Sequence, residues 1–167
     1  SGWRALYPDP LLDDLTALLR SWATPVQDTK VPPFDPDLSQ PIVHDGGPIA
    51  DFSASLIDAL YVPVATVAAA YEAGQAMVLL DARPGSDYLA GHITGAISVP
   101  FYRVEDAVPA LPDDVWLVAY CGCPHALSGD VVGQLSELGF ERVAVLDEGW
   151  FGWLAEALPT TEGPAQY

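Results

Sequence analysis

The feature that most constrains this fold is a series of continuous apolar segments, each separated from the next by a helical pattern. Three of them read AMVLLDA at residues 76–82, VWLVAYC at 115–121 and RVAVLD at 142–147. An apolar run without alternation is typical of a strand that is buried on both faces. Strands that alternate with helices favour a parallel sheet covered on both sides. The sequence therefore predicts an α/β fold in three layers.

The segments around these strands complete the same pattern. Glycine ends two of the predicted helices, and apolar side chains recur through them at helical spacing. The predicted helices lie at residues 63–74, 86–92, 128–139 and 149–158, and one further short strand is predicted at 96–100.

Residues 1–54 have a different character from the rest of the chain. Apolar side chains recur at helical spacing in residues 9–22, which predicts one amphipathic helix. Residues 24–51 are crowded with Pro, Gly and Asp, which predicts an irregular segment. We therefore expect an N-terminal extension at 1–54 and an α/β domain with a short C-terminal tail at 55–167.

The net charge of the chain argues against some classes of binding partner. The chain has 6 basic and 23 acidic residues, a formal net charge of −17. Such a surface repels phosphate backbones and anionic lipid, so we do not expect nucleic acid as a partner. No run of about 18 apolar residues occurs, so no membrane-spanning segment is expected. The sequence leaves the oligomeric state open, and both a cytoplasmic and an exported location.

Cys121 is the candidate nucleophile. It ends an apolar strand and precedes a loop and a helix, and ligands of parallel sheets bind at the carboxyl ends of strands. Asp81 ends another strand of the same kind. The amino end of a helix stabilises a thiolate by about 0.3–1 kcal/mol and so lowers the pKa of the thiol. The alternative is that Cys121 is an inert, buried apolar residue.

Three motifs in order resemble the rhodanese-like domains. The stretch LLDARPGSDYLAGHITGAISVPF at residues 79–101 resembles the first signature of that family, and VAYC resembles the strand that ends in its active cysteine. LDEGWFGW resembles the closing motif, with Glu148 in place of its first glycine. The resemblance covers residues 55–159, and the positions that match the first signature are Asp81, Arg83, Asp87, Gly91, His92, Ile93, Gly95, Ala96 and Pro100.

The resemblance implies a rhodanese-like fold, with a central parallel sheet of about five strands and helices on both faces. It also implies that Cys121 accepts a sulfane sulfur as a persulfide and passes it to a thiol or another nucleophile. The implied partners are a small sulfur donor and a thiol acceptor or acceptor protein, without a cofactor. The implied substrate-binding loop comprises Gly122, Cys123, Pro124, His125, Ala126, Leu127 and Ser128.

The loop departs from the family pattern because it contains neither Lys nor Arg. Pro124 also lacks an N–H, and we expect His125 to assist by charge or hydrogen bonding. We therefore do not expect thiosulfate as the natural donor. The loop length resembles that of related phosphatases, but Leu127 stands where they carry arginine, so phosphatase activity is not expected either.

Candidate pocket residues outside the loop are Asp81, Arg83 and Trp150. Arg83 could present its charge to the crevice or pair with Asp87 four residues later. His92 is interpreted as a residue held by backbone hydrogen bonds rather than a catalytic one.

Cys123 has three interpretations. It could be a resolving thiol for Cys121, a metal ligand together with Cys121 and His125, or an apolar loop residue. Three functions accordingly stay open at this point. They are a sulfurtransferase or persulfide carrier, a non-catalytic binding or regulatory module, and a dithiol redox or metal-handling protein.

Overall fold

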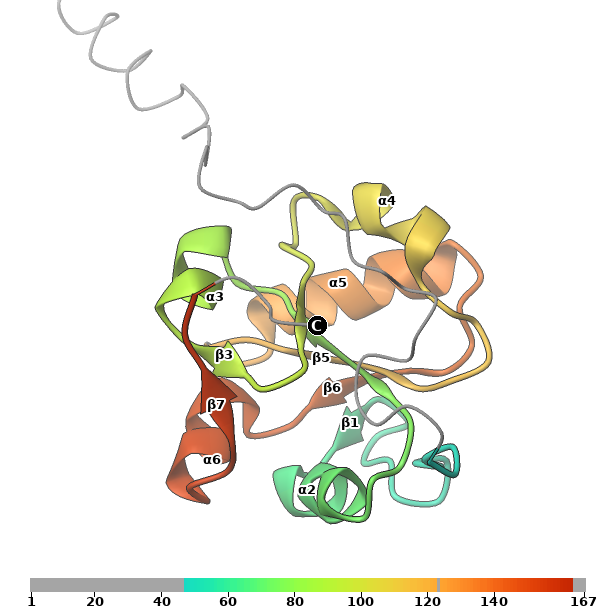
Figure 1. Ribbon diagram of the computed structural model, residues 1–167. Helices are drawn as coiled ribbons and strands as arrows, with labels where there is room; N and C mark the ends of the chain where they lie inside the picture. Colours follow the sequence, from blue (N-terminus) through green and yellow to red (C-terminus); the bar gives the residue numbers. More distant parts are fainter. Residues whose placement is uncertain (1–46, 123, 164–167) are drawn as a thin grey trace, which may run out of the picture.

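A computed structural model describes residues 47–122 and 124–163 (Figure 1), so the helix predicted at 9–22 lies outside the described residues. None of the helices in these ranges is long and apolar enough to cross a membrane. The elements follow one another as β1 (Tyr61–Val62), α2 (Val64–Glu72), β2 (Val78–Asp81), α3 (Gly85–Ala90), β3 (His92–Ile93), β4 (Ile97–Ser98), α4 (Val104–Ala107), η2 (Val108–Ala110), β5 (Leu117–Tyr120), α5 (Ala126–Glu137), β6 (Val143–Leu146), α6 (Gly149–Ala155) and β7 (Thr160–Thr161).

The central sheet has five strands in the order β1-β6-β5-β2-β4, and each neighbouring pair is parallel. This confirms the predicted α/β fold with a parallel sheet and helices around it. The carboxyl ends of parallel strands share one edge of a sheet. Because Asp81 of β2 pairs in register with Tyr120 of β5, Asp81 and Cys121 come to that same edge.

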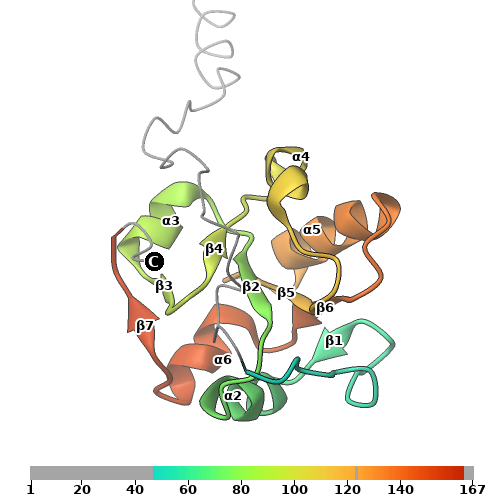
Figure 2. The ribbon, with the colours of Figure 1, turned by 45° about the vertical axis from the view of Figure 1, so that its right-hand side comes forward.

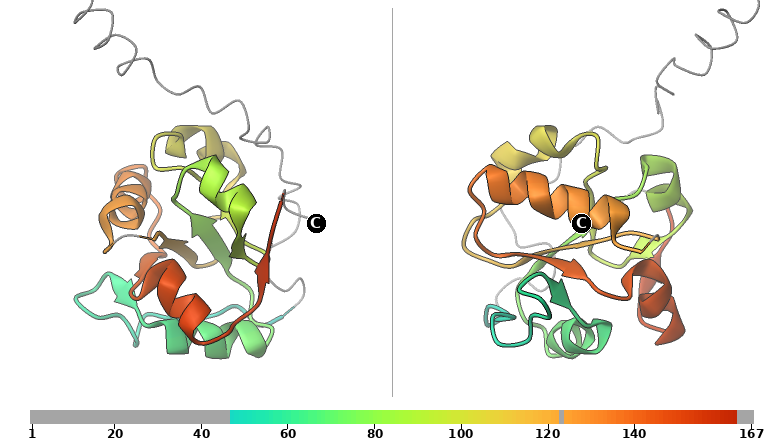
Figure 3. Two further views of the ribbon diagram at one scale, coloured as in Figure 1. Left: turned by 90° about the vertical axis from the view of Figure 1, so that its left-hand side faces the viewer. Right: turned by 180° about the vertical axis from the view of Figure 1, so that it is seen from behind.

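Successive side chains of each strand point to opposite faces of the sheet. In β5, Val118 and Tyr120 pack in the layer with α2 and α6, whereas Leu117, Ala119 and Cys121 pack in the layer with α4 and α5. Figures 1 and 3 show the same division, with α4 and α5 on one side of the sheet and α2 and α6 on the other. The cysteine therefore emerges on the face that α5 covers.

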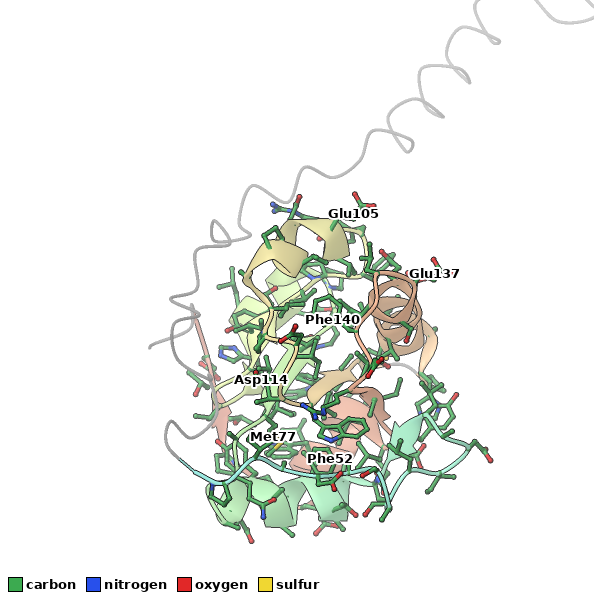
Figure 4. All side chains as sticks on the ribbon, turned by 90° about the vertical axis from the view of Figure 1, so that its right-hand side faces the viewer. Phe52, Met77, Glu105, Asp114, Glu137 and Phe140 are labelled. Atoms are coloured by element: carbon green, nitrogen blue, oxygen red, sulfur yellow. The ribbon has the colours of Figure 1, made fainter. Side chains whose placement is uncertain are left out.

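The core includes residues just before the predicted domain boundary. Ala50 and Phe52 are buried in the α2 layer, where the ring of Phe52 meets that of Trp116 edge-on at 5.8 Å. Ile49 adds a parallel bridge to Ala76. Figure 4 shows Phe52 on this side of the sheet and Phe140 on the side of α5.

Several short elements have no counterpart in the sequence prediction. Strand β1 has two residues, α4 has four, and β3 pairs with β7 in a separate antiparallel ribbon that Figure 2 shows beside the central sheet. Segments of two to four residues are too short to show a period of 2 or 3.6, so pattern analysis misses them.

Glu148 explains how this chain departs from the closing motif of the family. Its backbone has φ −84° and ψ −3°, an ordinary right-handed conformation that requires no glycine. Its carboxylate accepts a hydrogen bond of 2.7 Å from the N–H of Val64, the first residue of α2. The side chain therefore satisfies one of the unpaired donors at the amino end of that helix.

His92 is buried and has the backbone partner expected from the sequence. Its Nδ1 lies 2.8 Å from the carbonyl oxygen of Tyr88, and its ring stacks on that of Tyr88 with centroids 3.7 Å apart. Burial lowers the pKa of His92, and this outweighs the opposing effects of the Tyr88 carbonyl and of Asp81.

Replacing His92 with glutamine should flatten the pH dependence of stability. Because the pKa of His92 is lower in the folded protein, the unfolded chain binds the proton first as the pH falls below about 6.5. The free energy of unfolding of the wild type should then decrease more steeply than that of His92→Gln. Urea unfolding at several pH values between about 5 and 8 measures both slopes, and parallel curves would contradict the prediction.

Candidate active site

The sulfur of Cys121 lies against the first turn of α5. Its Sγ is 3.3 Å from Oγ of Ser128, and the two residues are 2% and 1% exposed. Ser128 is the third residue of α5, so the sulfur lies at the amino end of a twelve-residue helix. The first turn carries no acidic side chain that would offset the positive end of the helix dipole. Both the hydroxyl and the helix therefore favour a negatively charged sulfur.

The backbone of Cys121 is held by the start of α6. The N–H of Trp150 donates to the carbonyl oxygen of Cys121 at 3.0 Å. Gly149, just before it, has φ +58°, and a Cβ at this position would lie 2.5 Å from that same oxygen. Only glycine combines this left-handed conformation with this close approach. The second glycine of the closing motif therefore sets the position of the cysteine.

His125 closes the turn after Cys121 but directs its Nε2 elsewhere. Its φ of 59° is left-handed, and it is the cap residue of α5. Its Nε2 bonds the carbonyl oxygen of Asp147 and lies 3.1 Å from the Asp147 carboxylate. Its ring packs on that of Tyr61 with centroids 4.6 Å apart. The imidazole thus ties the loop to the ends of β1 and β6, and this nitrogen is not directed at the sulfur.

Asp81 is fully buried and forms the centre of a polar network. It accepts hydrogen bonds from the main-chain N–H of Arg83 at 3.0 Å and from the hydroxyl of Tyr120 at 2.8 Å. That hydroxyl also accepts a bond from the N–H of Ile93. Burial, followed by the charge of Asp81, raises the pKa of Tyr120 well above its ordinary value, so Tyr120 is the donor in its bond to Asp81.

Arg83 pairs with Asp81, a partner that neither of its two sequence interpretations named. Its Nε and Nη2 reach the two carboxylate oxygens at 2.9 and 2.6 Å, and Nη2 also donates to the carbonyl of Gly91. Arg83 lies at a bend two residues before α3, where its own N–H also bonds Asp81, so the helical spacing of four does not apply. Burial alone would lower the pKa of Arg83, and the Asp81 carboxylate outweighs it and raises that pKa.

Trp150 and Phe151 lie between this network and the loop. The guanidinium of Arg83 stands over the ring of Trp150, 4.6 Å from its centroid. Arg83 also runs beside Gly122, and a Cβ on Gly122 would lie 3.7 Å from its Cδ and 3.5 Å from the ring of Phe151. Phe151 is 65% exposed. The predicted pocket residues therefore adjoin the loop, with an exposed aromatic ring added to them.

The predicted substrate-binding loop divides into a turn and a helix start. Helix α5 begins at Ala126, not at Ser128, because the left-handed His125 reverses the chain earlier. Pro124 and Ala126 are exposed, whereas Leu127 packs against the core beside α5. Within the described residues no three His, Cys, Asp or Glu side chains are arranged to hold a metal. Cys123 lies outside those residues, so its three interpretations stay predictions.

Sequence reasoning did not single out Tyr120, Asp147 or Phe151. A signal existed for the first two, since each lies at the carboxyl end of a buried strand, the edge where Asp81 and Cys121 were sought. Phe151 follows Trp150 directly, and no pattern distinguishes an exposed aromatic ring from a buried one at this spacing.

Replacing Gly149 with alanine should destabilise the fold by about 1–3 kcal/mol, since the substitution combines left-handed strain with a collision at the Cys121 carbonyl. Gly133→Ala is the matched control, because nothing lies within 4 Å of a Cβ at that helical position. The control should stabilise the protein by up to about 1 kcal/mol. Urea unfolding measures both, and equal stability of Gly149→Ala and the wild type would contradict the role of Gly149.

Comparison with known proteins points to the same part of the chain. A model of the rhodanese-like domain matches residues 64–156. The HTH-type transcriptional regulator Rv0324 of Mycobacterium tuberculosis is 36% identical over 121 residues, covering 69% of this chain and 53% of that protein. The uncharacterized protein slr1261 of Synechocystis is 30% identical over 87 residues, covering 52% of this chain and 48% of that protein. The chain spans about half the length of these curated relatives.

Solved structures agree with the family match. The Alr3790 protein from Anabaena is 30% identical with a TM-score of 0.56, over 60% of this chain and 80% of that one. A thiosulfate sulfurtransferase from Pseudomonas aeruginosa is 26% identical with a TM-score of 0.51, over 64% of this chain and 21% of that one. With its parallel sheet, its strand-ending cysteine and a family match over more than half of its length, the chain belongs to the rhodanese-like domain family.

Proposed function

We propose that this domain is a sulfurtransferase or persulfide carrier in which Cys121 is the nucleophile. The observation that carries the proposal is the distance of 3.3 Å between Cys121 Sγ and Ser128 Oγ at the amino end of α5. A hydrogen bond to a charged group and the positive end of a helix both stabilise the thiolate, which is the reactive form of cysteine.

The proposed reaction has two steps. The Cys121 thiolate attacks the outer sulfur of a donor R–S–SH, so that the Sγ–S bond forms while the donor S–S bond breaks and R–S⁻ leaves with the electron pair. An acceptor thiolate then attacks the outer sulfur of the Cys121 persulfide, which regenerates the Cys121 thiolate. No net oxidant or reductant is required, and the partners are a small sulfur donor and a thiol acceptor.

The burial of Cys121 bears on how this reaction proceeds. At 2% exposure the sulfur is shielded from bulky thiols, which suits a carrier that has to retain its sulfur. The same burial restricts how a donor can approach Sγ. Small donors are therefore favoured over large ones.

A regulatory module is the second candidate function. It is favoured by the 36% identity to a protein whose name is HTH-type transcriptional regulator. In such a role Cys121 would take up sulfur once and hold it as a signal. A sulfurtransferase would instead turn over repeatedly in the presence of an acceptor thiol, so turnover number separates the two.

Incubation with a sulfane-sulfur donor should add one sulfur atom to the wild type and to Cys123→Ser, but none to Cys121→Ser. Intact mass spectrometry measures the gain, and a dithiol acceptor should remove it. A gain that persists in Cys121→Ser, or no gain from any donor, would contradict the proposal. Loss of two hydrogens that depends on both cysteines would point to a redox site instead.

Replacing Ser128 with alanine should slow alkylation of Cys121 at neutral pH by about tenfold and move the pH profile of the reaction upward, because the thiolate loses a hydrogen bond. Ser136→Ala is the control, since Ser136 is exposed near the far end of the same helix. Both variants should be built in Cys123→Ser so that one thiol is observed. Identical pH profiles for Ser128→Ala and Ser136→Ala would remove the support that Ser128 gives.

A further inference from the structure

We propose that this site selects organic persulfides with an uncharged, apolar substituent over sulfonate donors and over persulfides whose substituent carries a negative charge. The proposal rests on the proposed function of Cys121 and specifies the class of donor. It follows from three observations on the surroundings of the sulfur, namely the engagement of the cations, the nature of the turn after Cys121, and the apolar side chains beside that turn.

The cations in the described residues are already engaged. Three of these residues are Lys or Arg, namely Arg83, Arg103 and Arg142. Arg103 pairs with Asp106 at 2.7 Å, and Nη1 of Arg142 donates to the carbonyl of Asp114. Arg83 adjoins Gly122, but its charge is balanced by both oxygens of Asp81. Arg142 directly precedes β6, at the opposite end of the parallel sheet from Cys121. A donor sulfonate would therefore find no uncompensated cation beside Cys121 among these three, although charge-assisted bonds are what such a group requires.

Among its described residues, the turn after Cys121 offers an anion no Lys or Arg, and the amino end of α5 already faces the Cys121 sulfur. Gly122 has no side chain and Pro124 has no N–H to donate. Nε2 of His125 lies 3.1 Å from the Asp147 carboxylate, so an anion drawn to this ring would compete with a charge already there. The whole chain adds a formal charge of −17, which slows the approach of anions from solution.

Exposed apolar side chains lie beside the residue that follows Cys121. The ring of Phe151 lies 3.5 Å from the position of a Cβ on Gly122, the residue that follows the cysteine. Phe151 is 65% exposed, and Leu154, on the same side of α6 three residues later, is 43% exposed. A donor whose outer sulfur meets Sγ can lay an apolar substituent on this surface, which removes apolar area from water.

The transfer balances for such a donor. The Cys121 thiolate attacks the outer sulfur of neutral R–S–SH, the Sγ–S bond forms, and R–S⁻ leaves with the electron pair of the broken bond. The proton stays on the transferred sulfur and R–S⁻ is protonated by water. The donor reacts in its protonated form, and the negative charge passes from the enzyme sulfur to the departing thiolate.

The test compares two persulfides that differ in the charge of their substituent, and adds a sulfonate donor. Benzyl persulfide and 4-carboxybenzyl persulfide have the same reacting group, and thiosulfate is the sulfonate donor. The rate of one-sulfur gain on the full chain is measured by intact mass spectrometry and divided by the rate for 2-mercaptoethanol with the same donor. We expect the normalised rate for benzyl persulfide to exceed that for the carboxylate by about fivefold or more, and that for thiosulfate by more still.

Two variants address the two parts of the proposal. Phe151→Ala should slow loading from benzyl persulfide by about fivefold and leave methyl persulfide unchanged, whereas Leu138→Ala, at an exposed leucine directly after α5, should affect neither. Ala126→Arg adds a cation to the exposed first residue of α5 and should raise the thiosulfate rate by about tenfold. Ser136→Arg adds the same charge near the far end of that helix and should not.

The outcomes separate this inference from the proposed function. Loading of Cys121 at equal normalised rates by all three donors, or fastest loading by thiosulfate, would overturn the selectivity and leave the nucleophile intact. An unchanged benzyl persulfide rate in Phe151→Ala would overturn the role of the apolar surface. No sulfur gain from any donor would overturn both proposals.

Discussion

The buried carboxylate of Asp81 is the interaction on which the edge of the sheet depends. Transferring a charge from water into the protein costs several kcal/mol, and this cost is offset only when its oxygens are bonded. Both oxygens of Asp81 accept hydrogen bonds, from the backbone and guanidinium of Arg83 and from the hydroxyl of Tyr120. Since Tyr120 also accepts the N–H of Ile93, one carboxylate holds the ends of β2 and β5 and the start of the β3–β7 ribbon together.

Alternation along β5 separates this network from the sulfur. Tyr120 faces the layer of α2 and α6, and Cys121 faces the layer of α4 and α5. Asp81 and Arg83 therefore bond each other on one face and stabilise the strand ends there. The Cys121 thiol, on the other face, contacts the Ser128 hydroxyl at the amino end of α5. Arg83 thus lies beside the loop, but its charge is not available to a ligand there. Arg83 stabilises the ends of the strands.

Much of this could be predicted from the sequence. The buried strands, the main helices and the common edge of Asp81 and Cys121 follow from periodicity and from the geometry of parallel sheets. The partner of Arg83 did not follow, because choosing between Asp81 and Asp87 requires knowing that Arg83 precedes α3. The start of α5 did not either, since a left-handed histidine is rare and leaves no composition signal. Exposure of Phe151 depends on how α6 docks, which no local pattern encodes.

The closing motif has one position that backbone geometry restricts to glycine and one that it does not. Gly149 is restricted by its torsion angle and by the Cys121 carbonyl, whereas Glu148 has an ordinary conformation and bonds the start of α2. A search pattern that demands both glycines would thus discard genuine relatives, and one that weights the second alone would retain them. Because the Glu148 carboxylate bonds the N–H of Val64, a substitution at position 148 would act first on the start of α2, while Gly149 keeps its contact with the cysteine.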